Sequence, residues 1–179
     1  MSLTTSVTPH ATLAALETLP RLGLELRLPV AVDRFTWFGL GPHETYPDRR
    51  DSGLVGEWHG RVADQYVPYV MPQENGAKAE TRWAAVTDAH GAGLLAVAEG
   101  DLLSVGALPY GPEDLDLARH TVDLPEPSAT VLHLDHLMAG LGSASCGPKP
   151  LGQYLIPARP ARFTVRLQAV DGFVPVGDR

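Results

Sequence analysis

The sequence has one cysteine, no excess of basic charge and no long apolar run. With Cys146 alone, no internal disulfide can form, and a single thiol is typical of a cytoplasmic protein. The formal net charge of −7 disfavours a nucleic-acid or anionic-membrane partner, because both select basic surfaces. No stretch approaches the roughly 20 apolar residues of a membrane-spanning helix. We therefore expect a soluble, acidic, cytoplasmic protein with neither nucleic acid nor membrane as partner.

The N-terminus, MSLTTSVTPH, also lacks the basic-then-apolar pattern of a secretory signal. We interpret residues 1–18 as a poorly ordered leader that could be vector-derived, 19–172 as one domain and 173–179 as a tail. A chain of 179 residues can bury a stable hydrophobic core without disulfides or a structural metal. Its 18 glycines and 16 prolines indicate many turns, because a hydrophobic content of 44% argues against disorder.

Alternation of apolar and polar residues is the dominant pattern and is typical of half-buried strands. It is clearest in residues 22–28 and 162–170, and strands are also expected at 93–100, 102–110 and 130–137. Asn75-Gly76 predicts a hairpin that joins residues 65–71 to 78–86. Helical signals are confined to 112–120 and to a single turn within 51–59. The pattern predicts an all-β, antiparallel two-sheet sandwich.

Two patterns in the second half of the chain could carry chemistry, and each has a plainer reading. In HLDHL, His133 and Asp135 share a strand face while His136 points away, so only two metal ligands converge and a polar strand end is the simpler interpretation. Cys146 would need a nearby base to act as a nucleophile, and Ser143 and Ser145 lack the G-x-S-x-G setting. Neither pattern therefore predicts a metal site or a nucleophile.

The stretch WFGLGPHETYPDRR is too rich in special residues for an ordinary connection. Its Gly-Leu-Gly fragment lacks the third glycine of a nucleotide-binding loop. His43 and Glu44 are adjacent on an extended chain, so they point in opposite directions and do not form an acid-base pair. We interpret Glu44, Asp48 and Arg49 as a buried polar scaffold that holds a loop. Aromatic residues in the first half suit either sandwich packing or a sugar-binding surface.

Several motifs in order resemble one family: LPRLGLELRLP, WFGLGPHETYPDRR, YVPYVMPQENGAKAETRW and LHLDHLMAGLGSASCGP followed by LGQYLIPARPARFTVRL. Over residues 19–170 the chain is similar to the C-terminal, small-chain (fifth) domain of large multidomain bacterial β-galactosidases of glycoside hydrolase family 2. The matching positions are Gly39, Gly41, Pro42, Glu44, Tyr46, Asp48, Arg49, Gln73, Glu74, Asn75 and Gly76. The resemblance implies a galactose mutarotase-like supersandwich, here incomplete at its N-terminal side with an uncovered sheet edge.

The resemblance implies no catalytic residue in this chain. Family members hydrolyse terminal β-D-galactosides, such as lactose, with retention, through two glutamates about 5–5.5 Å apart. Those glutamates lie on a separate (β/α)₈ barrel, and this chain has no strand-helix repeat from which to build one. The family's Mg²⁺ and Na⁺ sites also lie mostly on other domains, so no cofactor is expected here. The implied partners are the barrel domain or large subunit, the galactoside, and a second copy in a homo-oligomer.

One loop of the family's domain reaches the sugar site, where well-known members carry a Ser-Trp step that stacks on substrate. Here Ser145 and Cys146 occupy that position, and a thiol offers no flat face to a sugar ring. The resemblance thus implies substrate contact at these two residues with an altered aglycone preference.

Two alternatives to a non-catalytic β-galactosidase domain remain open. The first is a freestanding mutarotase-type epimerase, in which His133 or His136 would act with Asp135 or Glu74 in acid-base ring opening. The second is an independent carbohydrate-binding module, supported by aromatic content alone.

Overall fold

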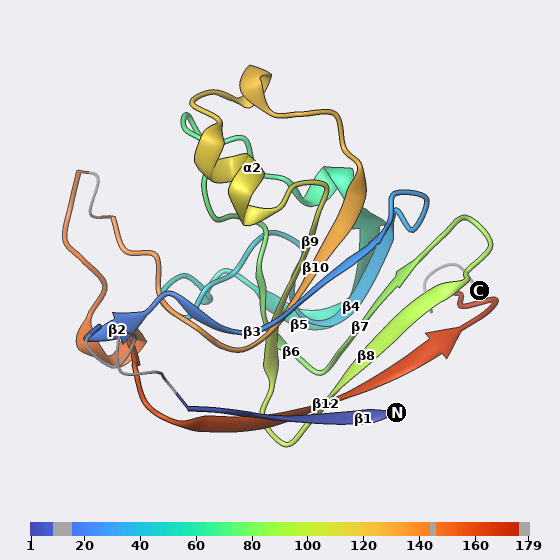
Figure 1. The fold of residues 1–179 in the computed structure, drawn as a ribbon, viewed down its shortest axis with the longest axis horizontal. Coiled ribbons are helices and arrows are strands. Elements are labelled where there is room, and N and C mark those ends of the chain that lie inside the picture. Colours follow the sequence, from blue (N-terminus) through green and yellow to red (C-terminus); the bar gives the residue numbers. More distant parts are fainter. Residues whose placement is uncertain (9–15, 144–145, 176–179) are drawn as a thin grey trace.

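The computed structural model describes residues 1–8, 16–143 and 146–175, and two antiparallel sheets form the body of this part (Figure 1). The six-stranded sheet has the order β1 (Ser2–Val7), β12 (Ala161–Val170), β8 (Gly93–Glu99), β7 (Trp83–Thr87), β4 (Arg34–Gly41) and β5 (Leu54–Arg61). The four-stranded sheet has the order β3 (Arg21–Pro29), β10 (Ala129–Met138), β9 (Leu103–Leu108) and β6 (Lys78–Thr81). A two-stranded ribbon pairs β11 (Ile156–Pro157) with β2 (Thr18–Leu19). The expected all-β sandwich is confirmed.

The core lies between the two sheets. Phe35, Trp37 and Val86 face it from the six-stranded sheet, and Leu132 and Leu134 face it from β10. Side chains alternate along a strand, so His133, between Leu132 and Leu134, points to the outer face of the four-stranded sheet. Its β9 neighbour Gly106 lies on the same outer face. That outer face carries His133 and Asp135, as the alternation predicted.

Helices are short in the described ranges. α2 (Pro112–Leu117) begins where Pro112 follows Gly111, and the carboxylate of Asp114 accepts a hydrogen bond from the Gly111 N–H at 2.8 Å. The 3₁₀ turns are η1 (Ala63–Gln65), η2 (Thr121–Asp123) and η3 (Gly152–Tyr154). The helix expected within 112–120 is confirmed. Among the described residues, no helix has the length and hydrophobicity needed to cross a membrane.

The N-terminal residues differ from expectation. Residues 1–18 were expected to be a poorly ordered leader, but Ser2–Val7 form strand β1, which pairs antiparallel with β12 along its whole length. Leu3 is half-buried opposite Val165 in this register, which gives the strand an apolar contact as well as backbone hydrogen bonds. Thr18 and Leu19 are also in a strand, and residues 9–15 lie outside the described part.

Two local predictions are wrong. Residues 51–59 do not form a helical turn; β5 runs from Leu54 to Arg61, because its backbone pairs with β4 from Gly41 to Arg34. Residues 65–71 are not a strand, and Asn75-Gly76 does not close a hairpin. Instead the buried Asn75 side chain binds its own loop, accepting from the Val67 N–H at 2.9 Å and donating to the Gln73 carbonyl at 2.8 Å. Side-chain hydrogen bonds of this kind compete with regular ladder pairing.

Candidate functional site

The glycines of the WFGLGPHETYPDRR stretch allow close packing at the end of β4. A Cβ added at Gly39 would lie 2.8 Å from the Thr81 Cα, and one at Gly41 would lie 2.6 Å from Trp58 Cδ1. The Gly41–Pro42 peptide bond is cis. β4 therefore ends against its neighbours, and the following residues enter a loop whose position is set by the polar side chains described next.

Glu44 joins this loop to the segment that carries Gln73 to Gly76. Its carboxylate accepts hydrogen bonds from Arg49 Nη2 at 2.6 Å, from the Gly76 N–H at 2.8 Å and from the Tyr69 hydroxyl. Gly76 has φ of +78° in this contact, a conformation that favours glycine. His43 instead contacts Ser52, with Nε2 2.9 Å from the hydroxyl, and is exposed. The structure therefore directs His43 and Glu44 to different partners.

A second polar network is centred on Arg21. The hydroxyl of the fully buried Tyr46 donates to Glu74 at 3.1 Å, and Arg21 Nη1 donates to the same carboxylate at 2.9 Å. Arg21 also donates from Nε to Asp135 at 3.2 Å. Burial raises the pKa of both the Glu74 and the Asp135 carboxyls, and the Arg21 guanidinium opposes this shift. Arg21 thus holds the buried Asp135 carboxylate and the partly exposed Glu74 carboxylate, a link that sequence reasoning did not predict.

Asp48 binds a loop from the other end of the chain. Its carboxylate accepts from the Gly142 N–H at 2.7 Å and from the Leu141 N–H at 3.1 Å. The approach is so close that a Cβ at Gly140 would lie 2.7 Å from Asp48 Cγ. Sequence reasoning placed Asp48 in a scaffold for its own loop and missed this long-range contact, which follows β10 and precedes Cys146.

Cys146, expected at the substrate loop, is an exposed thiol, and its N–H donates to the Ser143 carbonyl at 3.0 Å. Ser145, the other expected substrate-binding residue, lies outside the described residues. Gln73 donates from its side chain to the Met71 carbonyl at 3.1 Å. The structure therefore connects most of the matched positions through two loops, with Asp48 reaching the segment that contains Cys146.

His133 and His136 point to opposite sides of β10, as the alternation predicted. His136 stacks on Phe163 of the six-stranded sheet, with ring centroids 5.2 Å apart. His133 is buried on the outer face, where desolvation and the neighbouring Arg21 and Arg27 charges lower its pKa to about 3. In the described part of the chain, no group of three or more His, Cys, Asp or Glu side chains converges on a possible metal position.

Sequence reasoning also missed two buried cations. Arg21 was not singled out, although a buried Asp135 requires a positive partner, and that requirement was a usable signal. Lys78 is 2% exposed, and its ammonium lies 4.8 Å from the Trp37 ring centroid and donates to the Pro42 carbonyl at 3.2 Å. Burial lowers the pKa of Lys78 to about 8.

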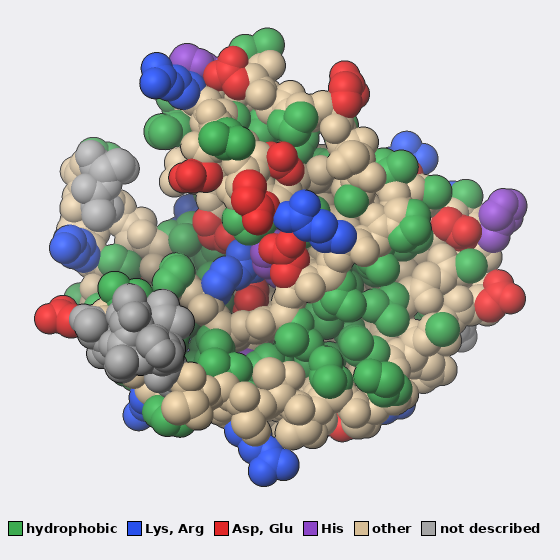
Figure 2. Space-filling model, viewed as in Figure 1, with side chains coloured by type: hydrophobic (Ala, Val, Ile, Leu, Met, Phe, Trp, Pro, Cys, Tyr) green, Lys and Arg blue, Asp and Glu red, His purple; other side chains and the backbone are tan. Residues whose placement is uncertain are grey.

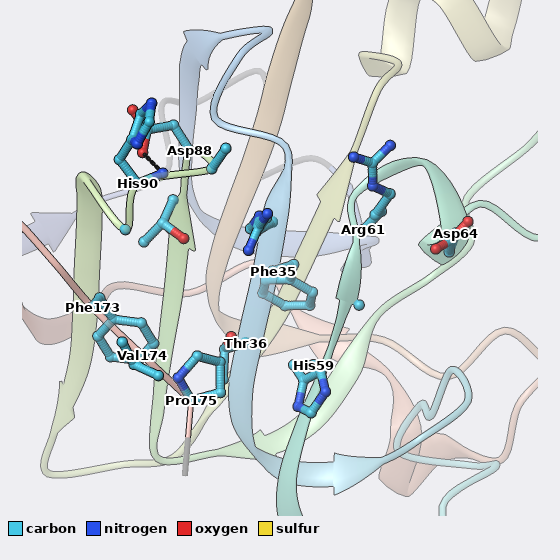
Figure 3. A pocket seen from close by; sticks show the side chains of 15 residues that line it. Phe35, Thr36, His59, Arg61, Asp64, Asp88, His90, Phe173, Val174 and Pro175 are labelled. Carbon is cyan, nitrogen blue, oxygen red and sulfur yellow. Dashed lines mark hydrogen bonds between the residues drawn. The ribbon is translucent and has the colours of Figure 1, made fainter. Parts of the chain in front are cut away.

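A hollow of about 480 Å³ is bordered by β4, β5, Asp64 of η1 and residues 87–91 and 173–175. Figure 3 shows the side chains that line it. The Asp88 carboxylate there accepts from the His90 and Ala92 N–H groups, which holds the turn. None of the matched motif positions lines this hollow. The candidate site is therefore the polar network of Glu44, Glu74 and Asp48 with its two loops.

The fold and this network define an antiparallel β-sandwich domain in which polar side chains hold loops in place. The chain belongs to the β-galactosidase small-chain family, because the family model described as "Beta galactosidase small chain" matches residues 1–167. Similar proteins include β-galactosidases of Arthrobacter sp. (strain B7), 35% identical over 84% of this chain, and of Bifidobacterium adolescentis, 36% identical over 86%. A β-galactosidase of Vibrio cholerae is 40% identical over 69%.

The match covers only a small part of each relative. The aligned region spans 15% of the Arthrobacter and Bifidobacterium proteins and 11% of the Vibrio protein. The chain thus corresponds to one domain of these larger β-galactosidases.

Proposed function

We propose that this chain is a non-catalytic sandwich domain of a β-galactosidase, which shapes part of the galactoside-binding site and supports assembly of the whole enzyme. The whole enzyme would hydrolyse terminal β-D-galactosides, such as lactose, in the cytoplasm with retention. Its two catalytic glutamates would lie on a separate barrel domain that is the principal partner, with a second copy as a further partner.

The observation that carries this proposal is the pair of hydrogen bonds from Leu141 and Gly142 to Asp48. An ionised carboxylate that accepts two backbone N–H groups forms charge-assisted hydrogen bonds, which fix the backbone that they hold. A matched family position therefore orders the start of the loop that, by resemblance, contacts substrate through Ser145 and Cys146. Positioning of this kind affects rate because small misplacements of substrate contacts are costly.

The carboxylates of the domain fit a structural role better than an acid-base role. Glu44 already accepts three hydrogen bonds, and Glu74 is occupied by Tyr46 and Arg21. A nucleophile or general base must instead be free to reach a substrate atom. These contacts support assigning hydrolysis to a part of the enzyme other than this domain.

The first test is the release of nitrophenol from a chromogenic β-galactoside by the purified chain. We expect no release. Turnover that disappears on mutation of Glu44 or Glu74 would overturn the proposal. Polarimetry of freshly dissolved α-galactose tests the epimerase alternative, which requires accelerated mutarotation by the same preparation.

The second test uses a β-galactosidase that contains this domain. Cys146→Trp adds a flat ring at the position where well-known family members stack a tryptophan, and Cys146→Ser is the matched control of nearly unchanged size. We expect the tryptophan variant to change KM for galactosides with aromatic aglycones while the serine variant resembles the parent. Equal kinetics for all three proteins would contradict a substrate contact at Cys146.

A further inference from the structure

A second hollow lies on the outer face of the four-stranded sheet, and none of residues 139–148 lines it. Its volume is about 710 Å³, within the usual range of small-molecule sites. Strands β9 and β10 provide the floor, residues 70–75 one wall and α2 the other. Figure 2 shows charged and histidine side chains gathered in a depression beside the helix, with hydrophobic side chains around it.

The floor of the hollow is kept open by a glycine. Gly106 on β9 lies directly opposite His133 on β10, and an added Cβ at Gly106 would meet no atom within 4 Å. Its φ lies outside the left-handed region, so backbone conformation does not require glycine here. The absence of a side chain at Gly106 therefore creates space above the sheet.

Polar and apolar groups line different parts of this space. Arg21 and Glu74 form an ion pair of 2.9 Å whose side chains are 24% and 34% exposed. Tyr110 makes an edge contact with Tyr66, with ring centroids 5.3 Å apart, which holds its ring in place. Leu115, from α2, adds an apolar wall. This combination resembles small-ligand sites, which are mainly apolar with a few placed polar groups.

The charges disfavour an anionic ligand. Arg21 is already bound by Glu74 and Asp135, and the lining adds the carboxylate of Asp116. His133 contributes no positive charge near neutral pH, because its pKa is lowered to about 3 by burial and by the adjacent arginines. A phosphate or carboxylate would therefore meet a surplus of negative charge, whereas a neutral ligand would not.

We propose that this hollow binds a neutral polyhydroxylated ligand, a mono- or disaccharide, at a site separate from the loop of residues 139–148. Hydroxyl groups of a sugar can accept from Arg21 and donate to Glu74, while Tyr110 and Leu115 contact the C–H face of the ring. The inference does not rest on the proposed role of the chain in a β-galactosidase, because it concerns residues of this domain alone.

The site binds without opening the sugar ring. Glu74 and Asp135 are held by Arg21, and the imidazole of His133 is a weak base at a pKa of about 3. Acid-base catalysis is most effective when the pKa of the catalytic group lies near the working pH. Mutarotation of galactose is therefore expected to proceed at its uncatalysed rate in the presence of the chain.

The experiment is a titration of the full chain with galactose and with lactose, followed by amide NMR. We expect the peaks of Gly106, Tyr110 and His133 to shift with at least one of the two sugars, and inorganic phosphate to leave them unchanged. No shift at these peaks up to tens of millimolar of either sugar would overturn the proposal. So would equal shifts with phosphate, or shifts confined to residues 139–148.

Variants of Gly106 provide a direct test of the space. Gly106→Leu fills the hollow and is expected to weaken sugar binding by roughly tenfold or more. Gly152→Leu is the matched control, because an added Cβ at Gly152 also meets no atom within 4 Å and the residue lies outside the hollow. Unchanged affinity in a folded Gly106→Leu chain would overturn the proposal.

If Gly106→Leu fails to fold, the wild-type peak shifts decide by themselves. The same amide NMR experiment is repeated with the catalytic part of a β-galactosidase as the added probe. If that part broadens the peaks of Gly106, Tyr110 and His133 while sugars leave them unmoved, the hollow is a domain-docking surface and the saccharide site is excluded.

Discussion

Asp48 holds Gly142, 94 residues away in the sequence, through a hydrogen bond of 2.7 Å from the Gly142 N–H to its carboxylate. The same carboxylate accepts from Leu141 at 3.1 Å. This carboxylate therefore joins the loop after β4 to the loop after β10. This contact gives the WFGLGPHETYPDRR stretch a role beyond its own loop.

Asp48→Asn is expected to lower the free energy of unfolding by about 1–3 kcal/mol, because one of the two N–H groups then faces an amide that cannot accept from it. The measurement is urea unfolding, with hydrogen exchange at Leu141 and Gly142 as a local probe of the loop. Asp51→Asn, at an exposed position directly after this stretch, is the control. Equal stability and equal exchange in both variants would show that the contact is not maintained in solution.

Arg21→Met is expected to destabilise the chain by about 3 kcal/mol or more, since it leaves Asp135 and Glu74 without their cation. Arg27→Met is the matched control on the same strand. Arg27 is half-exposed and pairs with Glu25 and Glu113 at the surface, so its loss should change stability far less than the loss of Arg21. Denaturant midpoints of the two variants test this, and similar losses in both would contradict the role of Arg21.

The buried ammonium of Lys78 predicts that the free energy of unfolding rises at alkaline pH. Its pKa is about 8 in the folded chain and ordinarily about 10.5, because burial disfavours the charged form. Between these values the unfolded chain binds more protons, so stability increases with pH across the window. The full contribution is on the order of 3 kcal/mol.

The test for Lys78 is urea unfolding of the wild-type chain and of Lys78→Met from pH 7 to pH 10. Other titrating groups are common to both proteins, so the difference between them isolates the ammonium. We expect the wild-type chain to gain stability relative to Lys78→Met as the pH rises. Parallel pH profiles would show that the ammonium is solvated in the folded chain.

Burial of His133 predicts a loss of stability at acidic pH. Its folded-state pKa of about 3 lies below the ordinary 6.5, because burial and nearby arginines disfavour protonation. The unfolded chain therefore binds more protons between these values, and stability falls as the pH is lowered from 6.5 towards 3. His133→Gln should lose less stability than the wild-type chain between pH 6.5 and pH 4. An imidazole NMR signal of His133 that titrates near pH 6.5 would refute the buried, neutral state.

The strands of this protein were largely predictable because they depend on local pattern. Alternation in residues 22–28 and 162–170 predicted β3 and β12, and it also placed His133 and His136 on opposite sides of β10. Local pattern failed where tertiary contacts competed with it. Asn75-Gly76 has the favoured hairpin sequence, yet the Asn75 side chain satisfies loop backbone groups and Gly76 donates to Glu44.

The sequence by itself determined the fold class, the family resemblance and the set of polar residues that matter, since composition, periodicity and motif spacing are properties of the chain in order. Only the tertiary structure decided which of these residues meet. Arg21 reaches Asp135 across 114 positions and Asp48 reaches Gly142 across 94, and no local pattern encodes such pairs. Such partners are chosen by strand register and by the need of each buried charge for a counterion or an N–H group, and that need is satisfied only when the sheets have packed.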